Sequence, residues 1–210
     1  MQYAQTLQSP KRYSFRPIPR NPVPMSIAQR TGPLSGLSGC SAMLLADAEN
    51  LIYSAANLGY SLSFVRLAEL LRQASRRCTL HTFLSTPPQG HDARIEPFEQ
   101  SGWVIHTNPI HEVKTRNGSR LRANSDNFLL FSAGRLLSKH RVDKVIIGSG
   151  DGDLSDDLAR AVSELDTKPL VLTMSLAGST SHRLNAVHNP RIAGNIEVGL
   201  DCLYPTHRIC

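Results

Sequence analysis

Four aspartates stand where this sequence predicts that buried strands end or helices begin, and carboxylates at such positions can bind divalent metal ions. The apolar run 145–147 breaks into Gly148-Ser149-Gly150-Asp151-Gly152-Asp153, which predicts a strand that ends in a tight acidic turn before a helix. Another apolar run, 42–46, ends at Asp47, and Asp126 opens a later helical stretch. Ligands of open α/β sheets bind beyond the carboxyl ends of the strands, so a doubly wound sheet would bring these acids to one edge.

Carboxylates that crowd together cannot all stay ionised without a partner, so either their pKa values rise or a cation binds. Mg²⁺ and Mn²⁺ suit such an all-oxygen set of ligands. A metal held in this way can orient a water, lower its pKa and stabilise the leaving oxygen of a phosphodiester. The sequence therefore predicts a metal site for Mg²⁺ or Mn²⁺ whose ligands and catalytic groups are Asp47, Asp126, Asp151 and Asp153.

Each of these acids also has a purely structural interpretation. Asp153, directly before Leu154, can cap the free N–H groups of a helix, and Asp47 can be a cap or turn residue. Asn50 can likewise be an N-cap, and Asp126 a first-turn charge. A dinucleotide-binding phosphate loop is disfavoured because its third glycine position holds Asp153, and a P-loop is excluded because no Lys-Ser/Thr pair follows.

The pattern of elements predicts an α/β fold, a three-layer α/β/α sandwich with a mostly parallel central sheet, because short apolar strands alternate with amphipathic helices. A hairpin is expected over 112–122, with its turn at Asn117-Gly118. Residues from about 195 onward have no assignment. The expected strands are 42–46, 79–84, 103–106, 144–147 and 170–174, and the expected helices begin at Asn50 and cover 62–76, 95–100, 124–138, 154–165 and 181–187.

Composition predicts a disordered basic tail over 1–40, a folded domain over 41–195 and a C-terminal extension over 196–210. The tail is rich in Pro, Ser and Arg and holds five basic residues and no acid. The rest of the chain has 18 basic and 17 acidic residues, so the net charge of +6 does not by itself indicate nucleic-acid binding. Prolines in the tail would break the helix that a transit peptide needs, and Met25 is an alternative start.

Several classes of protein are disfavoured by the sequence. No apolar run approaches the ~20 residues that cross a bilayer, and no apolar segment of a secretory signal follows the early basic residues. The four cysteines form no Cys-x-x-Cys pair, which favours reduced thiols over zinc. We therefore expect a cytoplasmic protein without a membrane partner. A homodimer is one assembly that the sequence leaves open.

Basic side chains gather on the expected hairpin, at Lys114, Arg116, Arg120 and Arg122. They are either a solvated hairpin or a basic finger that grips an RNA backbone beside the acids. In the second interpretation Lys114, Arg116 and Arg122 bind substrate.

Three segments together resemble the NYN domain, in its LabA/DUF88 branch, a relative of the PIN-domain nucleases. They are Leu44-Leu45-Ala46-Asp47-Ala48-Glu49-Asn50, the helix opened by Asp126, and the stretch from Ile146 to Leu154; Ser181-His182-Arg183-Leu184 resembles a late Ser-x-x-Leu signature. The similarity covers about residues 41–190. It implies a PIN-like sandwich and metal-dependent hydrolysis of RNA, single-stranded RNA above all, by the four aspartates, with Asn50 and Ser149 holding the site or contacting the phosphate.

The chain departs from the family pattern at three positions. Ser132 stands where a further Asp is frequent, Leu154 where an aromatic residue is usual, and His188 where many members carry an acid. The main hypothesis is a ribonuclease. Ser132 and His188 leave open a catalytically degenerate RNA-binding or regulatory module with the same fold. A third hypothesis is a small-molecule phosphohydrolase that uses the same metal site.

Overall fold

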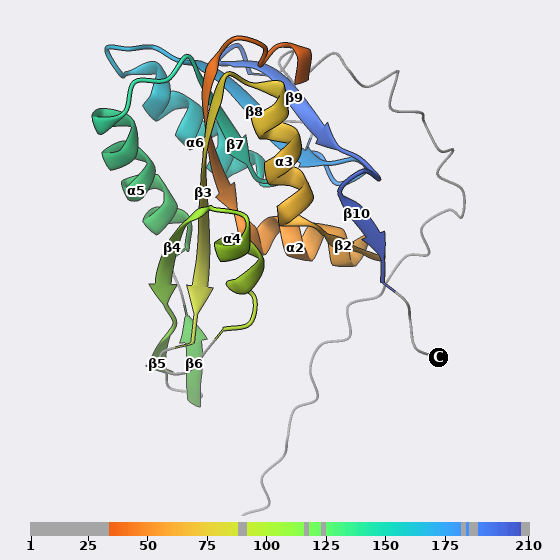
Figure 1. Cartoon of the computed structure of the whole chain (residues 1–210). Helices are drawn as coiled ribbons and strands as arrows, with labels where there is room; N and C mark the ends of the chain where they lie inside the picture. Colours follow the sequence, from red (N-terminus) through yellow and green to blue (C-terminus); the bar gives the residue numbers. More distant parts are fainter. Residues whose placement is uncertain are drawn as a thin grey trace, which may run out of the picture. The chain divides into compact units, whose positions relative to one another are not determined.

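The computed structural model of the protein describes residues 34–87, 92–115, 118–122, 125–181, 184 and 189–206. Figure 1 shows their arrangement. In chain order the elements are β1 (Ser41–Asp47), α2 (Ala48–Asn57), β2 (Tyr60–Leu62), α3 (Phe64–Ala74), β3 (Arg77–Thr86), α4 (Glu96–Gln100), β4 (Val104–Pro109), β5 (His111–Thr115), β6 (Gly118–Arg122), α5 (Ser125–Lys139), β7 (Lys144–Gly148), α6 (Gly152–Ser163), β8 (Leu170–Leu176), β9 (Ile192–Val198) and β10 (Leu203–Pro205).

A six-stranded parallel sheet forms the centre of the fold, in the order β4-β3-β1-β7-β8-β9. The chain moves from β1 outward through β3 and β4, then returns to the other side of β1 with β7. The order of strands therefore reverses between β1 and β7, which is where ligands of such sheets bind. The predicted α/β fold with a mostly parallel central sheet is confirmed.

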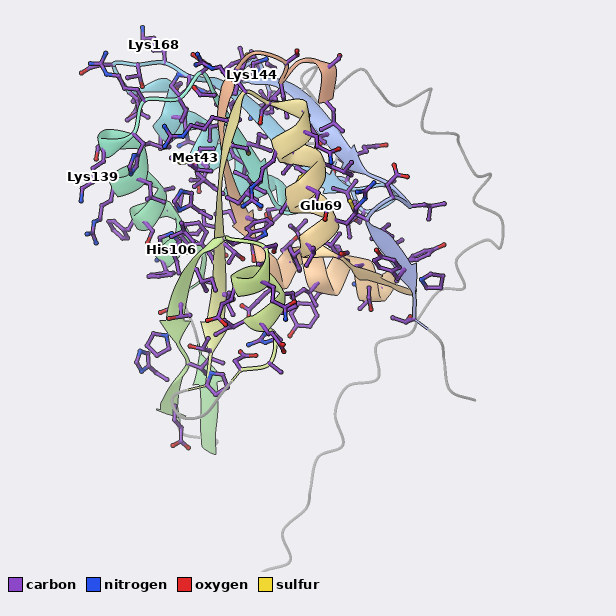
Figure 2. All side chains as sticks on the ribbon, viewed as in Figure 1. Met43, Glu69, His106, Lys139, Lys144 and Lys168 are labelled. Atoms are coloured by element: carbon purple, nitrogen blue, oxygen red, sulfur yellow. The ribbon has the colours of Figure 1, made fainter. Side chains whose placement is uncertain are left out.

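Helices cover both faces of this sheet, because alternate residues of each buried strand point to opposite sides. In β1, Leu44 and Ala46 join the core beneath α2, α3 and α4, whereas Met43 and Leu45 join the core beneath α5 and α6. Met43 lies inside the molecule between sheet and helices, and Lys139, on the end of α5, extends into solvent (Figure 2). The strands read as continuous apolar runs because both of their faces are buried.

Helix α2 takes an unusual course for a helix between parallel strands. In Figure 1 it extends sideways from the lower end of β1 toward β2, and α3 then returns along the sheet before β3. The expected helix 62–76 begins only at Phe64, because Leu62 belongs to β2 and the Ser63 side chain accepts a hydrogen bond from the Arg66 N–H at 3.2 Å as the N-cap. Because α2 starts directly at the end of β1 and extends sideways, it lies along the edge of the sheet where the parallel strands have their carboxyl ends.

Three strands have no counterpart in the sequence prediction. β2 and β10 contain three residues each and pair with one another in antiparallel fashion, which is too short for a hydrophobic period to show. β9 is the edge strand of the main sheet and alternates buried and exposed positions around Gly194, a residue that weakens any strand pattern. It runs through residue 195, where the folded domain was expected to end.

Part of the expected tail is folded. The side chain of Leu37 is fully buried and belongs to the hydrophobic core on the face of the sheet that α3 covers, and the Cys40 carbonyl accepts a hydrogen bond from the Arg76 N–H at 3.0 Å. A single apolar contact of this kind leaves no periodic signal among Ser and Gly residues. Residues 1–33 lie outside the described residues, as does most of the helix expected over 181–187. No helix within the described ranges is long and apolar enough to span a membrane.

Candidate active site

Two neighbouring strands, β1 and β7, deliver the acidic residues to one edge of the sheet. Their register pairs Ala46 with Gly148, so each strand ends at the same level. The two strands approach closely at this point: a Cβ on Gly148 would lie 3.0 Å from the Met174 side chain and 3.3 Å from the Ala46 backbone. Glycine at position 148 thus permits the packing that sets the two strand ends side by side.

Asp47 is the N-cap of α2. It has an extended backbone, and its side chain accepts a hydrogen bond from the Asn50 N–H at 3.1 Å. The interpretation of Asn50 as the N-cap is wrong, and the helix begins at Ala48 rather than at Asn50. An aspartate satisfies the free N–H groups at a helix start and is stabilised by the helix dipole, which explains why the cap falls on the last residue of the strand.

Asp151 has the same position at the start of α6. Its side chain accepts hydrogen bonds from the N–H groups of Asp153 (2.8 Å) and Leu154 (3.4 Å). The interpretation of Asp153 as this cap is therefore wrong: Asp153 lies one residue inside the helix, in its first turn, and is exposed. Asp47 and Asp151 are thus held in equivalent positions, each by a helix that follows one of two adjacent strands.

Asn50 connects the two helix starts. The Gly150 N–H donates a hydrogen bond of 2.7 Å to Asn50 Oδ1, and a Cβ on Gly150 would come within 3.1 Å of that oxygen. Ser149, the other residue expected to hold the site, is fully buried and accepts a hydrogen bond from the Asp151 N–H at 3.1 Å. In this geometry both side chains support the acidic turn from within.

Burial raises the pKa of Asp47 to about 6. The hydrogen bond from Asn50 opposes this shift, and the negative charges of Asp126, Glu49 and Asp151 add to it. Asp126 is an exposed first-turn residue of α5, on the opposite layer of helices from α2. Its effect on Asp47 shows that residues from three elements bring their charge to the same strand end.

The donor set at this edge has the chemistry that Mg²⁺ and Mn²⁺ prefer, because it consists of carboxylates alone. Within the described ranges, however, no three His, Cys, Asp or Glu side chains already stand close enough together to hold a metal ion. The backbone thus places Asp47 and Asp151 firmly. The exposed Asp126 and Asp153 would have to turn toward them to complete a metal site.

The sequence matches the family model described as the NYN domain over residues 41–190. The chain belongs to the NYN family. This family consists of predicted metal-dependent ribonucleases of the PIN-like superfamily. The match covers every element from β1 to β8, and so includes both strand ends and all four aspartates.

A crystal structure of a protein of unknown function from Vibrio parahaemolyticus RIMD 2210633 is similar to this NYN domain. The TM-score is 0.61 at 18% identity, and the match covers 79% of this chain and 97% of that one. At this identity the likeness concerns the fold alone. No curated protein matches the chain.

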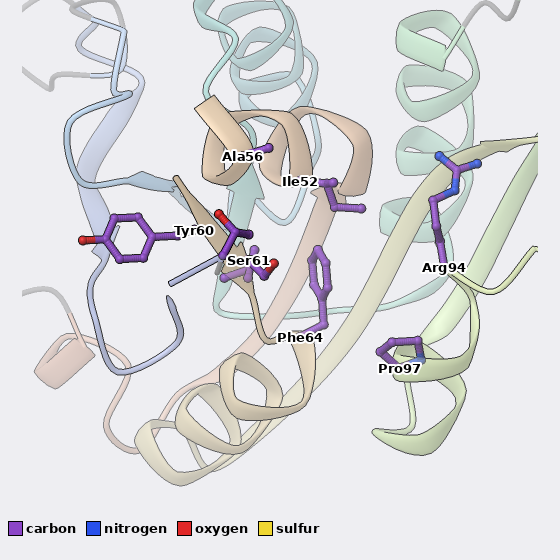
Figure 3. Close-up of a pocket in the computed structure, with 9 residues that line it drawn as sticks. Ile52, Ala56, Tyr60, Ser61, Phe64, Arg94 and Pro97 are labelled. Atoms are coloured by element: carbon purple, nitrogen blue, oxygen red, sulfur yellow. The ribbon is translucent and has the colours of Figure 1, made fainter. Parts of the chain in front are cut away.

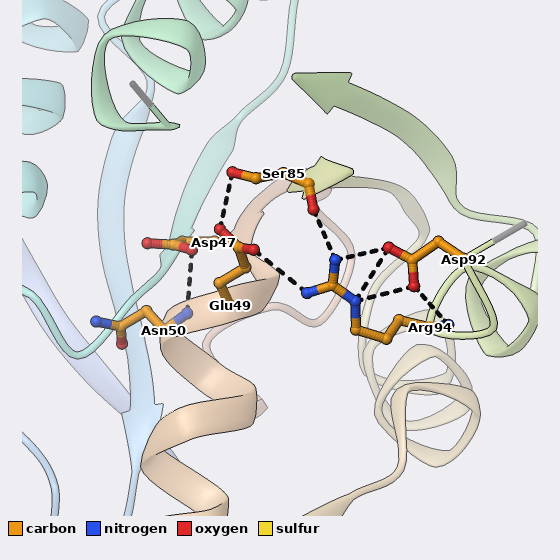
Figure 4. Close-up of polar contacts among 6 residues, drawn as sticks. All are labelled: Asp47, Glu49, Asn50, Ser85, Asp92 and Arg94. Carbon is orange, nitrogen blue, oxygen red and sulfur yellow. Dashed lines mark hydrogen bonds and ion pairs between the residues drawn. The ribbon is translucent and has the colours of Figure 1, made fainter. Parts of the chain in front are cut away.

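A charged network beside Asp47 has no counterpart in the sequence prediction. Figure 4 shows Arg94 between Asp92 and Glu49. Its guanidinium contacts Asp92 Oδ2 at 2.6 Å and Glu49 Oε1 at 3.3 Å, and it donates to the Ser85 carbonyl at 2.6 Å. Ser85 Oγ in turn donates to Glu49 Oε2 at 2.9 Å. No local spacing pairs residues 49, 85 and 94, so no sequence pattern could have found the network.

The hairpin expected between the fourth strand and the central helix is present as β5 and β6. Thr115 pairs with Gly118, so Gly118 belongs to β6 and its expected place in the turn is wrong; residues 116 and 117 lie outside the described residues. The hairpin continues from the carboxyl end of β4, the edge of the sheet that carries the aspartates (Figure 1). Lys114 and Arg122 belong to its two strands. Their role in binding substrate stays a prediction.

Proposed function

We propose that this protein is a metal-dependent ribonuclease that hydrolyses RNA phosphodiester bonds at the edge of the sheet where β1 and β7 end. The observation that carries the proposal is the paired placement of Asp47 and Asp151 as caps of α2 and α6. Burial, with a smaller contribution from the charges of Asp126, Glu49 and Asp151, raises the pKa of Asp47 to about 6, and a cation bound beside this carboxylate would lower the free energy of its ionised form. Membership of the NYN family supports this interpretation.

Each residue of the site has a distinct role in the proposal. Asp47 and Asp151 ligate Mg²⁺ or Mn²⁺, and Asp126 and Asp153 complete the site or position the attacking water. Asn50 holds the acidic turn through the Gly150 N–H, so that the two ligands keep their spacing. The metal, when bound, lowers the pKa of a water and stabilises the leaving oxygen.

Single-stranded RNA is the proposed substrate. The β5–β6 hairpin extends from the same edge as the acids, and its basic residues Lys114, Arg116 and Arg122 would bind the phosphates on either side of the cleaved bond (Figure 1). The LabA/DUF88 assignment belongs to this proposal as well, because it rests on the sequence motifs rather than on the fold.

The test replaces Asp151 by Asn. Asparagine is as good an N-cap as aspartate, so α6 keeps its start while the site loses a charge. Asp157→Asn is the matched control, because Asp157 is an exposed residue of the same helix and pairs only with Arg160 among the described contacts. We expect purified wild type and Asp157→Asn to cleave single-stranded RNA with Mn²⁺ or Mg²⁺, and to stop on addition of EDTA. Asp151→Asn should lose at least 100-fold in rate, the order found when a transition-state group is removed.

Equal cleavage by wild type and Asp151→Asn would mean that the activity comes from a contaminating nuclease or another site. The second candidate is an RNA-binding module without turnover. It is favoured by Ser132 in place of an acid on α5 and by the lack of a preassembled metal cluster among the described side chains. RNA binding without cleavage under every divalent ion tested would establish it.

A further inference from the structure

A half-open groove runs beside the candidate active site, along α2. It has a volume of about 250 Å³ and is bounded by α2, β2, the start of α3 and the segment around α4. Figure 3 shows Ile52 and Phe64 on one side of the groove and Arg94 and Pro97 on the other. Nothing in the proposed hydrolysis uses this space.

Arg94 joins the groove to the active site. Its side chain lines the groove and at the same time pairs with Glu49, whose charge acts on Asp47. The lining residues of α2, Ile52 and Ala56, lie about 8 and 14 Å along the helix axis from the Asp47 cap, at 1.5 Å per residue. At the ~3.4 Å rise of stacked nucleotides, this distance corresponds to about two to four nucleotides of a bound strand.

The chemistry of Arg94 decides which part of an RNA fits here. Asp92, Glu49 and the Ser85 carbonyl accept hydrogen bonds in the plane of the guanidinium, and two of these partners are carboxylates. The charge of Arg94 is therefore already compensated, which disfavours a phosphate. What such a fixed guanidinium still offers is its flat face, a surface on which nucleobases stack.

The size of the groove agrees with this interpretation. Its volume equals that of about eight waters at ~30 Å³ each, and it lies below the 300–1,000 Å³ typical of pockets for drug-sized ligands. A volume of this size is enough for one ring system. The walls are apolar at Ile52, Phe64 and Pro97, and the hydroxyls of Ser61 and Thr206 supply polar contacts for a ring edge.

We propose that this groove binds one unpaired nucleobase of the RNA substrate, placed between the guanidinium of Arg94 and the apolar wall formed by Ile52 and Phe64. The inference rests on the proposed function, since it assigns a base-binding subsite to the same strand. A base held here fixes the register of the RNA relative to the aspartates, and it favours single strands because a paired base cannot leave its stack without cost.

The test measures binding of a short single-stranded RNA in EDTA, with one nucleotide at a time replaced by an abasic unit. For wild type we expect one position at which the abasic unit weakens binding about 10-fold, within the roughly 5- to 150-fold range of single base-stacking contacts. Ala56→Trp fills the groove from an exposed position on α2, and it should weaken binding of the intact RNA about 10-fold and abolish the effect of that abasic position. The matched control is Asn57→Trp, an exposed neighbour that does not line the groove.

Arg94→Lys provides a second variant, because lysine keeps the charge beside Asp92 and Glu49 and loses the flat face. It should show the same loss of the abasic effect. If wild type binds RNA and no abasic position weakens the binding, the base site is overturned and the ribonuclease proposal stays intact. If the same abasic position weakens binding equally in wild type, Ala56→Trp and Arg94→Lys, the base binds elsewhere and the proposed base site is also overturned. A wild type that neither binds nor cleaves RNA overturns both proposals together.

Discussion

Replacement of Asp47 by Asn should stabilise the metal-free protein near neutral pH. The substitution removes a carboxylate whose ionisation is opposed by burial and by three nearby acids. It leaves the start of α2 intact, because asparagine accepts the Asn50 N–H as an N-cap about as well as aspartate does. The variant therefore isolates the cost of one negative charge.

The size of the effect follows from the pKa of Asp47, which is about 6 in the folded chain against 3.8 in the absence of these surroundings. Because the folded-state pKa is the higher one, the neutral carboxyl favours folding fully below pH 3.8, and this contribution is lost as the pH rises through 6. One pKa unit corresponds to about 1.36 kcal/mol, and Asp47 is partly exposed, so at pH 7.5 we expect a gain of about 2–3 kcal/mol for Asp47→Asn. For a domain of this size that is about 4–12 °C in Tm.

The assay is thermal unfolding of wild type and variant in EDTA at pH 7.5 and pH 4. The stabilisation should be present at pH 7.5 and nearly absent at pH 4, where wild-type Asp47 is protonated. Asp126→Asn serves as a control that removes only one of the neighbouring charges, and it should give a smaller gain. A gain that is equal at both pH values, or no gain at pH 7.5, would refute the electrostatic reasoning.

Two further predictions concern the stability of the fold. Asn50→Ala removes the acceptor of the Gly150 N–H and should lower the free energy of unfolding by about 1–3 kcal/mol. The control, Asn57→Ala at an exposed position of the same helix, should change it by less than about 0.5 kcal/mol. Urea unfolding measures both values, and equal values would show that the Asn50 contact contributes nothing. Burial lowers the pKa of His81 to about 4, so the stability that depends on its neutral form is present above pH 6.5 and lost as the pH falls toward 4. Wild type should therefore lose about 2 kcal/mol more than His81→Gln between pH 7 and pH 4.5 in urea unfolding, and parallel losses would contradict this.

The sequence predicted the framework of this site because its main signals are local. The apolar runs ending at Asp47 and at Gly148 are buried on both faces, so hydrophobicity alone marks them as strands, and the glycine-aspartate turn marks a break before a helix. At α2 the interpretation of Asp47 as a cap is confirmed, whereas at α6 the cap is Asp151 and not Asp153. Asp151 and Asp153 have the same chemistry two positions apart in the turn, and only the backbone conformation decides which of them accepts the N–H groups.

The parts that sequence analysis missed depend on contacts between distant segments. Arg94 meets Glu49 because the chain folds back after β3, and β9 is a strand because β8 offers it an edge. Neither relation leaves a periodic pattern in its own segment. Leu37 was assigned to a disordered tail for the same reason, since one buried leucine among glycines and serines becomes informative only when the core around it is known.

At the candidate active site, the two aspartates at the strand ends have no cationic partner among the described contacts. Helix starts and backbone N–H groups hold Asp47 and Asp151 at adjacent strand ends, but Asn50 uses its side chain to fix the acidic turn, and Arg94 compensates Glu49 and Asp92. No basic side chain therefore pairs with Asp47 or Asp151 among the described contacts, although the guanidinium of Arg94 pairs with Glu49, two residues after Asp47. A fold selected for stability alone would pair Arg94 with Asp47. Because Arg94 pairs with Glu49 and Asp92 instead, the negative charge at the end of β1 is left for a divalent ion to neutralise. The guanidinium of Arg94, whose charge is compensated, keeps a flat face that suits a base.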